Sequence, residues 1–137
     1  MTIEEINHFC RNTLVANLGI EFFMNDEQHL YAKMPVNEKT LQPLGYLHGG
    51  ASLALAETLA SAASFLVAEK HQIVFTVQVL ANHVKTVREG YVKAITAPIH
   101  FGKSTHIWDV NIYDDEEQLI STARVSNRIQ DSNSTSG

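Results

Sequence analysis

A single carboxylate stands within a long uncharged stretch of this sequence. Between Leu44 and Ala68, Glu57 is the only acidic or basic residue. If the stretch is a helix with about 100° per residue, four residues lie within about 40° of Glu57, three of them small: Gly50, Leu53, Ser61 and Ser64. A solvated helix face normally mixes charged side chains, whereas small residues let another element or a ligand approach closely. We therefore predict a functional, partly buried carboxylate, with an ordinary solvated glutamate as the alternative.

The dipeptide Gly49-Gly50 follows His48 near the start of this stretch. Glycine lets the backbone come close to a ligand, and the first N–H groups of a helix have no acceptor within the helix. Together with the helix dipole, these groups stabilise negative charge on an oxygen, which is the chemistry of an oxyanion hole. The alternative is an ordinary loop-to-helix junction, in which glycine supplies an unusual dihedral angle and His48 caps the backbone.

The spacing of these two candidates has a consequence for assembly. Gly49 and Glu57 are eight residues apart, which corresponds to about 12 Å of helix rise. This distance is too long for both groups to act on one carbonyl within a single chain. If both act, two chains must meet, and a two-fold dimer with antiparallel long helices would place Glu57 of one chain opposite Gly49 of the other. The spacing therefore predicts a shared site in a homodimer.

Two helices are predicted around these residues. Thr2 to Leu18 has the pattern of an amphipathic helix, because Thr2 and Glu5 have capping-box spacing and apolar residues recur every three or four positions. Gly19 can end this helix. The stretch from Gly49 to about Ala68 is rich in Ala and Leu, which favours a long core helix.

Six strand-like segments, bounded by polar or glycine-containing turns, complete the pattern: Ile20–Met24, His29–Met34, Ile73–Val84, Tyr91–Phe101, Thr105–Tyr113 and Leu119–Ile129. The first two predict a hairpin, and the last four suit antiparallel pairing. One face of the third segment is fully apolar: Ile73, Phe75, Val77 and Val79. We predict one α+β domain over residues 1–129, with a curved antiparallel sheet wrapped around the long helix, and a disordered tail over residues 130–137.

Composition narrows the classes of function. With 137 residues, 45% of them hydrophobic, the chain fits a single domain. Its net charge is −5 and its ten Lys and Arg are scattered, which argues against nucleic-acid binding. The one cysteine, Cys10, excludes an internal disulfide and fits a cytoplasmic protein. Glu4 and Glu5 stand where a secretory signal needs basic residues, and the one long apolar stretch contains Glu57, so no membrane span is predicted.

The seven histidines do not form a metal-binding pattern. The sequence has no HExxH motif, and His100 with His106 alone would lack ligands, so we predict no metal. A nucleophile elbow is also missing, and Cys10 has no partner base.

Four motifs make the sequence recognisable: Gln42–Ser52 (QPLGYLHGGAS), Ala56-Glu57-Thr58, Asn82-His83-Val84 and Arg88-Glu89-Gly90. With these motifs the chain resembles the hotdog-fold thioesterase superfamily from about Leu18 to Ile129. Within it, the likeness is to the phenylacetyl-CoA type branch, which includes bacterial 1,4-dihydroxy-2-naphthoyl-CoA thioesterases and 4-hydroxybenzoyl-CoA thioesterases with a helix glutamate. The resemblance implies a hotdog fold and hydrolysis of acyl-CoA thioesters, with coenzyme A as part of the substrate and no cofactor.

The resemblance also implies roles for individual residues. Glu57 matches the catalytic carboxylate, as nucleophile or as general base, and the Gly49 N–H matches the donor to the thioester carbonyl. Gln42 and His48 match positions that orient the thioester, and Ser61 matches a hydroxyl that helps hold the attacking water. Substrate and CoA binding would fall on two strands and a loop: Thr76, His83, Val84, Lys85, Thr86, Arg88, His100, Phe101, Gly102, Lys103, Ser104 and Thr105.

The sequence leaves the acyl group, the assembly and the reaction class open. The family hydrolyses aromatic acyl groups, such as dihydroxynaphthoyl or benzoyl, as well as medium-chain fatty acyl groups. For this chain we predict a homodimer at minimum, and a homotetramer built from two such dimers. A hotdog hydratase or dehydratase also carries an acidic residue on the central helix, and a non-catalytic acyl-CoA-binding domain is a further alternative.

Overall fold

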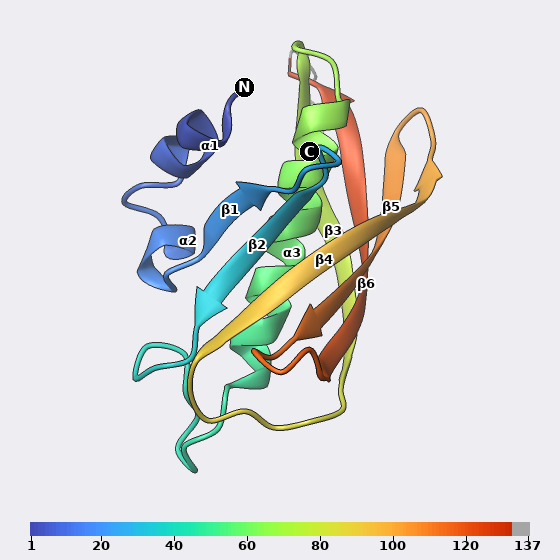
Figure 1. Cartoon of the computed structure of the whole chain (residues 1–137). Helices are drawn as coiled ribbons and strands as arrows, with labels where there is room; N and C mark the ends of the chain where they lie inside the picture. Colours follow the sequence, from blue (N-terminus) through green and yellow to red (C-terminus); the bar gives the residue numbers. More distant parts are fainter. Residues whose placement is uncertain (133–137) are drawn as a thin grey trace.

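The computed structural model describes residues 1–132 and consists of an antiparallel sheet that curves around a long helix (Figure 1). Along the chain the elements are α1 (Ile3–Phe9), α2 (Leu14–Asn17), β1 (Glu21–Met24), β2 (Leu30–Pro35), α3 (Gly49–Val67), β3 (Gln72–His83), β4 (Tyr91–Phe101), β5 (Thr105–Tyr113) and β6 (Leu119–Asp131). The strand order is β1-β2-β4-β5-β6-β3, and all neighbouring strands are antiparallel. The predicted α+β fold class is confirmed, with β1 and β3 as the two sheet edges.

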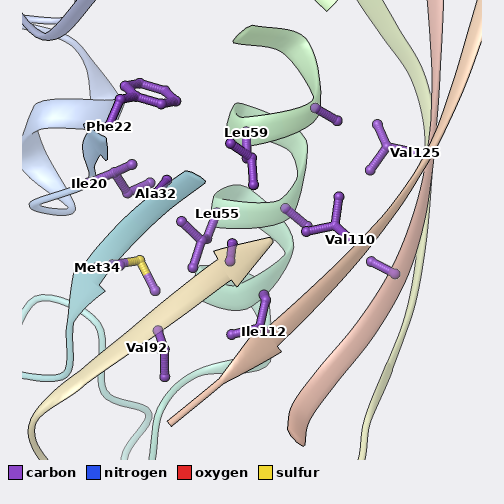
Figure 2. Packing of buried hydrophobic residues seen from close by; sticks show 14 of the residues in the cluster. Ile20, Phe22, Ala32, Met34, Leu55, Leu59, Val92, Val110, Ile112 and Val125 are labelled. Carbon is purple, nitrogen blue, oxygen red and sulfur yellow. The ribbon is translucent and has the colours of Figure 1, made fainter. Parts of the chain in front are cut away.

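The hydrophobic core lies between α3 and the sheet (Figure 2). Leu55 and Leu59 of α3 are fully buried, and β2 and β5 alternate buried with half-buried residues, as strands with one face on a core do. The strands supply the remaining large, fully buried apolar side chains: Phe22, Met34, Val92, Val110, Ile112 and Val125. By length and composition alone α3 could cross a membrane. Because it packs against β2, β3, β4, β5 and β6, we interpret it as the core helix of the domain.

The predicted continuous helix from Thr2 to Leu18 is wrong. The chain forms α1 and α2 instead, and between them Asn12 has a φ of 61°, in the left-handed region. Asparagine tolerates this conformation better than most residues do, and the turn it makes ends α1 early. The capping box of Thr2 and Glu5 is confirmed. Gly19, with a φ of 77°, follows the end of α2 as predicted.

β3 lacks the single apolar face predicted for it. Its pairing with β6 shifts between Thr76 and Gln78, so Val77 is an extra residue that reverses the alternation of the strand. Phe75 and Val77 are therefore exposed, whereas Val79 is partly buried against the core. This edge of the sheet consequently carries exposed apolar side chains.

The C-terminal strand is longer than predicted. β4 and β5 have the predicted bounds, but β6 continues past Ile129 to Asp131, where it pairs with Gln72 of β3. The Ser132 N–H then donates to the His71 carbonyl at 2.8 Å. The predicted disordered tail therefore starts too early, since residues 130–132 join the sheet edge. The rest of that predicted tail, residues 133–137, lies outside the described residues.

Candidate active site

His48 shapes the first turn of α3. It is the N-cap residue, with extended backbone angles, and its ring Nδ1 accepts the Gly50 N–H at 2.7 Å. Because Nδ1 is an acceptor, the neutral ring carries its proton on Nε2. Within residues 1–132, no acceptor takes the Gly49 N–H. This donor is therefore available to a developing oxyanion.

The imidazole of His83 packs against Gly49. A Cβ atom at position 49 would lie 2.8 Å from His83 Nε2, so glycine is the residue that fits without displacing the ring. The other ring nitrogen, Nδ1, shares a hydrogen bond of 2.7 Å with the hydroxyl of buried Ser121. Both His83 and Gly49 border a pocket of about 470 Å³, which is also lined by Val84, Lys85 and Thr86. The predicted oxyanion donor, the Gly49 N–H, thus lies beside one group of predicted CoA-binding residues.

Glu57 lies about two turns further along α3, beside a different pocket. This pocket has a volume of about 400 Å³. Apart from Glu57, Thr58 and Ser61, its lining is apolar: Met1, Ile6, Phe9, Cys10, Val15, Phe22, Ala62, Phe65, Ile73 and Val74. Glu57 itself is exposed in the single chain, so the predicted partial burial is wrong for an isolated subunit. The carboxylate therefore stands at the rim of an apolar pocket.

α1 forms one wall of this pocket and is tied to β1. The Asn7 side chain donates to the Phe22 carbonyl at 3.2 Å and accepts the Phe22 N–H at 2.9 Å. These two bonds satisfy backbone groups on the open edge of the sheet. Cys10 follows α1, and burial raises the pKa of its thiol. The thiol is consequently held in its protonated form near neutral pH.

A buried polar network behind the site was not predicted. Ser64 is fully buried, and its Oγ bonds Trp108 Nε1 at 2.7 Å, Asn127 Nδ2 at 3.0 Å and His106 Nδ1 at 3.0 Å. The predicted place of Ser64 on the accessible face beside Glu57 is therefore wrong. The sheet curves far enough around α3 to cover this position, and its partners are 42 to 63 residues away in sequence. Helical periodicity alone carries no signal of such partners.

The hydrogens of this network fix the protonation state of His106. Trp108 Nε1 and Asn127 Nδ2 both donate to Ser64 Oγ, so the single hydroxyl proton of Ser64 is left for His106 Nδ1. The ring is therefore neutral, with Nδ1 unprotonated. Burial lowers the pKa of His106, and the neighbouring His100 lowers it further.

We expect this neutral histidine to make the fold sensitive to mild acid. In the unfolded chain His106 takes a proton below its ordinary pKa of 6.5, whereas the folded chain resists protonation. The contribution to stability is therefore complete above about pH 6.5 and is lost as pH falls towards the lowered folded pKa. The variant His106→Asn keeps an acceptor near Nδ1 and cannot titrate. Thermal unfolding at pH 7.5 and 5.5 should show a larger drop in Tm for the native protein than for the variant, and equal drops would contradict the assignment.

Thr76 of the predicted CoA-binding set lies against α3, where its hydroxyl is 2.9 Å from Ser61 Oγ. Most of the others fall into two groups at opposite ends of the sheet. His83 pairs with Ser121 of β6, whereas Thr105 pairs with Arg128, seven residues further along β6. Seven residues of extended strand span about 23 Å. The group at 83–86 therefore lies near the start of α3, and the group at 100–105 lies at the far end of the sheet (Figure 1). A single chain does not bring the two groups together.

Gln42 and Arg88 belong to the end of the molecule where α3 begins. The Gln42 side-chain oxygen accepts the Leu44 N–H, which leaves the NH₂ group of the amide for other acceptors. Arg88 donates to the Tyr46 hydroxyl at 2.8 Å, and its guanidinium carbon lies 4.6 Å from the centre of that ring. Both side chains are thus oriented by the loop that leads into α3.

The second group surrounds the hairpin between β4 and β5. The His100 ring lies over Gly102, where a Cβ atom would approach Nε2 to 2.7 Å. Phe101 packs edge-on against His106 and Trp108, with ring centres 4.9 and 5.2 Å away. Lys103 and Ser104 are exposed and Thr105 is half-buried. Among the described residues, no three His, Cys, Asp or Glu side chains gather as a metal site would require.

Known proteins share both the sequence and the fold. A family model described as Thioesterase superfamily matches residues 44–121. The proofreading thioesterase EntH of Cronobacter turicensis is 40% identical over 129 residues, covering 94% of this chain and 94% of that protein. The crystal structure of a Haemophilus influenzae thioesterase superposes with a TM-score of 0.95 at 36% identity, covering 100% of this chain and 96% of that one. A Pseudomonas aeruginosa thioesterase, solved as a mutant, has a TM-score of 0.92 at 36% identity, covering 96% and 95%.

The matched region contains the candidate site. Residues 44–121 include the predicted oxyanion donor at Gly49, the predicted catalytic carboxylate at Glu57, and His83, which packs against Gly49. The three relatives are thioesterases, and their similarity covers nearly the whole of this chain. This favours hydrolysis over the hydratase and binding-domain alternatives. The chain therefore belongs to the thioesterase superfamily, has the hotdog fold and is a thioester hydrolase.

Proposed function

We propose that this enzyme hydrolyses aromatic or medium-chain acyl-CoA thioesters at a site shared by two subunits. Glu57 of one subunit is the catalytic carboxylate, and the Gly49 N–H of the other stabilises the oxyanion. The observation that carries the proposal is the separation of the two candidate groups along α3. Within residues 1–132, the N–H at its first residue has no acceptor, and a carboxylate stands about two turns away at the rim of an apolar pocket.

The chemistry follows from these two groups. Gly49 donates to the thioester oxygen as the carbonyl carbon becomes tetrahedral, and the positive end of the α3 dipole adds to the stabilisation. Glu57 either takes a proton from water, which attacks the carbon, or attacks it directly to form an anhydride that water then hydrolyses. In both routes the C–S bond breaks, the CoA sulfur leaves with a proton, and the acyl group leaves as the free acid.

The exposed edge of β3 supports self-association. Phe75 is 53% exposed, Val77 60% and Leu80 64% on a strand with one open edge. A second copy pairing along this edge would satisfy the open backbone groups and set its own apolar β3 side chains beside these exposed ones. Two-fold pairing would also run the α3 helices antiparallel, which sets Glu57 of one copy opposite Gly49 of the other. A homotetramer built from two such dimers stays a prediction.

The same two-fold symmetry would bring together the two groups of predicted CoA-binding residues, one from each subunit. The group at 83–86 lies with Gly49, and the group at 100–105 lies at the opposite end of the sheet. An antiparallel partner would bring its 100–105 group to the Gly49 end of the first copy. Lys85 and Lys103 are exposed cations that can meet CoA phosphates there, while Thr86 and Ser104 offer hydroxyl donors.

The substrate class follows from the pocket beside Glu57. Its volume of about 400 Å³ lies within the range of roughly 300–1,000 Å³ typical of small-molecule sites. The apolar lining favours a ring or a medium chain over acetyl, because each buried CH₂ contributes about 0.8 kcal/mol. The cytoplasmic location stays a prediction, supported by the single reduced cysteine.

A thiol-release assay over a panel of acyl-CoA esters tests this substrate class. We expect kcat/KM for benzoyl-, dihydroxynaphthoyl- and octanoyl-CoA to exceed that for acetyl-CoA by at least about tenfold. A factor of ten needs only about 1.4 kcal/mol, or roughly two buried CH₂ groups. Acid and free CoA should appear in equal amounts. An enzyme that prefers acetyl-CoA would contradict the assignment of the pocket.

A further inference from the structure

A chain of hydrogen bonds runs from Ser61 into the core of the domain. Ser61 Oγ lies 2.9 Å from Thr76 Oγ1, which lies 3.0 Å from Asn127 Oδ1. Asn127 is fully buried, and its Nδ2 donates to the Ala60 carbonyl at 3.2 Å and to Ser64 Oγ at 3.0 Å. The chain thus links one residue of the acyl pocket on α3 to β3 and β6.

The direction of every bond in this chain is determined. A backbone carbonyl only accepts, so the side-chain atom of Asn127 that faces Ala60 is the nitrogen, and the oxygen faces Thr76. An amide oxygen also only accepts, so the Thr76 hydroxyl must donate its proton to Asn127. Thr76 then has no proton left for Ser61, and the Ser61 hydroxyl must donate to Thr76.

The orientation of Ser61 follows from this direction. With its proton held by Thr76, Ser61 Oγ presents only lone pairs to the pocket that it lines together with Glu57. Glu57 and Ser61 stand one helical turn apart, so both can reach one water molecule. A water that donates one hydrogen to the carboxylate and the other to Ser61 has its own lone pair left for the thioester carbon.

We propose that Thr76 and Asn127 are positioning residues, which rests on the proposed role of Glu57. They hold the Ser61 hydroxyl as an acceptor, so that Ser61 orients the attacking water and does not donate to the Glu57 carboxylate. Without them, the Ser61 proton is free to turn to the carboxylate or to a carbonyl of its own helix. A hydrogen bond from the Ser61 hydroxyl to the Glu57 carboxylate would reduce the basicity that hydrolysis needs. In this role Thr76 acts through Ser61, and not as the CoA contact that the resemblance implies.

The test replaces the Thr76 hydroxyl with a methyl group, which keeps the shape of the side chain. Thr76→Val should lower kcat about tenfold while KM for the acyl-CoA changes less than about twofold. Thr76→Ser restores the hydroxyl and should recover most of the lost kcat. Thr122→Val is the matched control, since Thr122 of β6 donates in the same way to Asn111 Oδ1, at 2.7 Å. That variant should keep the native kcat and KM, and Tm is measured for all variants.

A double-mutant cycle separates positioning from a general structural role. If Thr76 acts through Ser61, Thr76→Val adds no further loss of kcat to a Ser61→Ala enzyme. If Thr76→Val lowers kcat by the same factor in the native enzyme and in the Ser61→Ala enzyme, the proposal is overturned. A Thr76→Val enzyme with native kcat overturns it as well. If Thr76→Val fails to fold, Thr76→Cys takes its place, because it keeps a group of similar size with weak hydrogen bonding. Its kcat should fall several-fold. Native kcat for Thr76→Cys overturns the proposal.

These outcomes are distinct from a failure of the proposed function. A Glu57→Gln enzyme with native kcat would remove Glu57 from the chemistry, whatever Thr76 does. An inactive Glu57→Gln enzyme, combined with independent effects of Thr76 and Ser61, would overturn only the positioning role.

Discussion

Replacing Glu57 with glutamine is expected to lower kcat for acyl-CoA hydrolysis by at least about 10². Glutamine keeps the size and shape of the side chain at the rim of the pocket, but it can neither accept a proton from water nor attack the thioester. Because Glu57 is exposed in the single chain, the variant should fold with a native Tm. Thiol release under saturating acyl-CoA measures kcat directly.

Two further variants sharpen this experiment. Glu69→Gln makes the same substitution at an exposed glutamate just after α3, and it should leave kcat unchanged. Glu57→Ala should be as inactive as Glu57→Gln, since both remove the carboxylate. A Glu57→Gln enzyme that retained kcat within a few-fold of the native value would exclude Glu57 as base and as nucleophile.

The parts of the fold that could be predicted from the sequence are those with local signals. β4 and β5 have the predicted bounds because the tight turn around Gly102 separates two long apolar strands. α3 was predictable from its Ala and Leu content and from the two glycines at its start. The shared-site hypothesis also came from a local quantity, the helix rise between Gly49 and Glu57.

The parts that could not be predicted depend on contacts between distant residues. The apolar periodicity of residues 2–18 continues across the break at Asn12, because α1 and α2 both turn one side to the core. The bulge at Val77 reverses the alternation of β3 only through its register with β6. The bonds from Ser64 to Trp108 and Asn127 cross between elements that are far apart in sequence. In each case a contact with a residue far away in sequence determines a local structure that the sequence pattern does not.

Two inactive chains are expected to restore activity to each other when they are mixed. In a shared site each catalytic unit takes Gly49 from one chain and Glu57 from the other. A heterodimer of a Glu57→Ala chain and a Gly49→Pro chain then has one site with both lesions and one site with neither. It should show about half the native activity per dimer. After random exchange of equal amounts, about half of the dimers are mixed, so the whole sample should reach about a quarter of native activity.

The structure makes Gly49→Pro a suitable partner for this experiment. Gly49 is the first residue of α3, where proline is well tolerated, and its N–H has no acceptor within residues 1–132. Proline therefore removes the proposed oxyanion donor without breaking a bond within residues 1–132. Its side chain presses on His83, however, since a Cβ atom there would lie 2.8 Å from Nε2.

Gly49→Ala separates these two effects. Alanine crowds His83 as proline does, but it keeps the N–H donor, so it should retain far more kcat if the donor is what matters. If site residues came from one chain, every mixed dimer would lack an intact site, because each chain carries one lesion. Persistent inactivity in purified, folded heterodimers would therefore exclude the shared site, and so would full activity in a protein diluted to monomers.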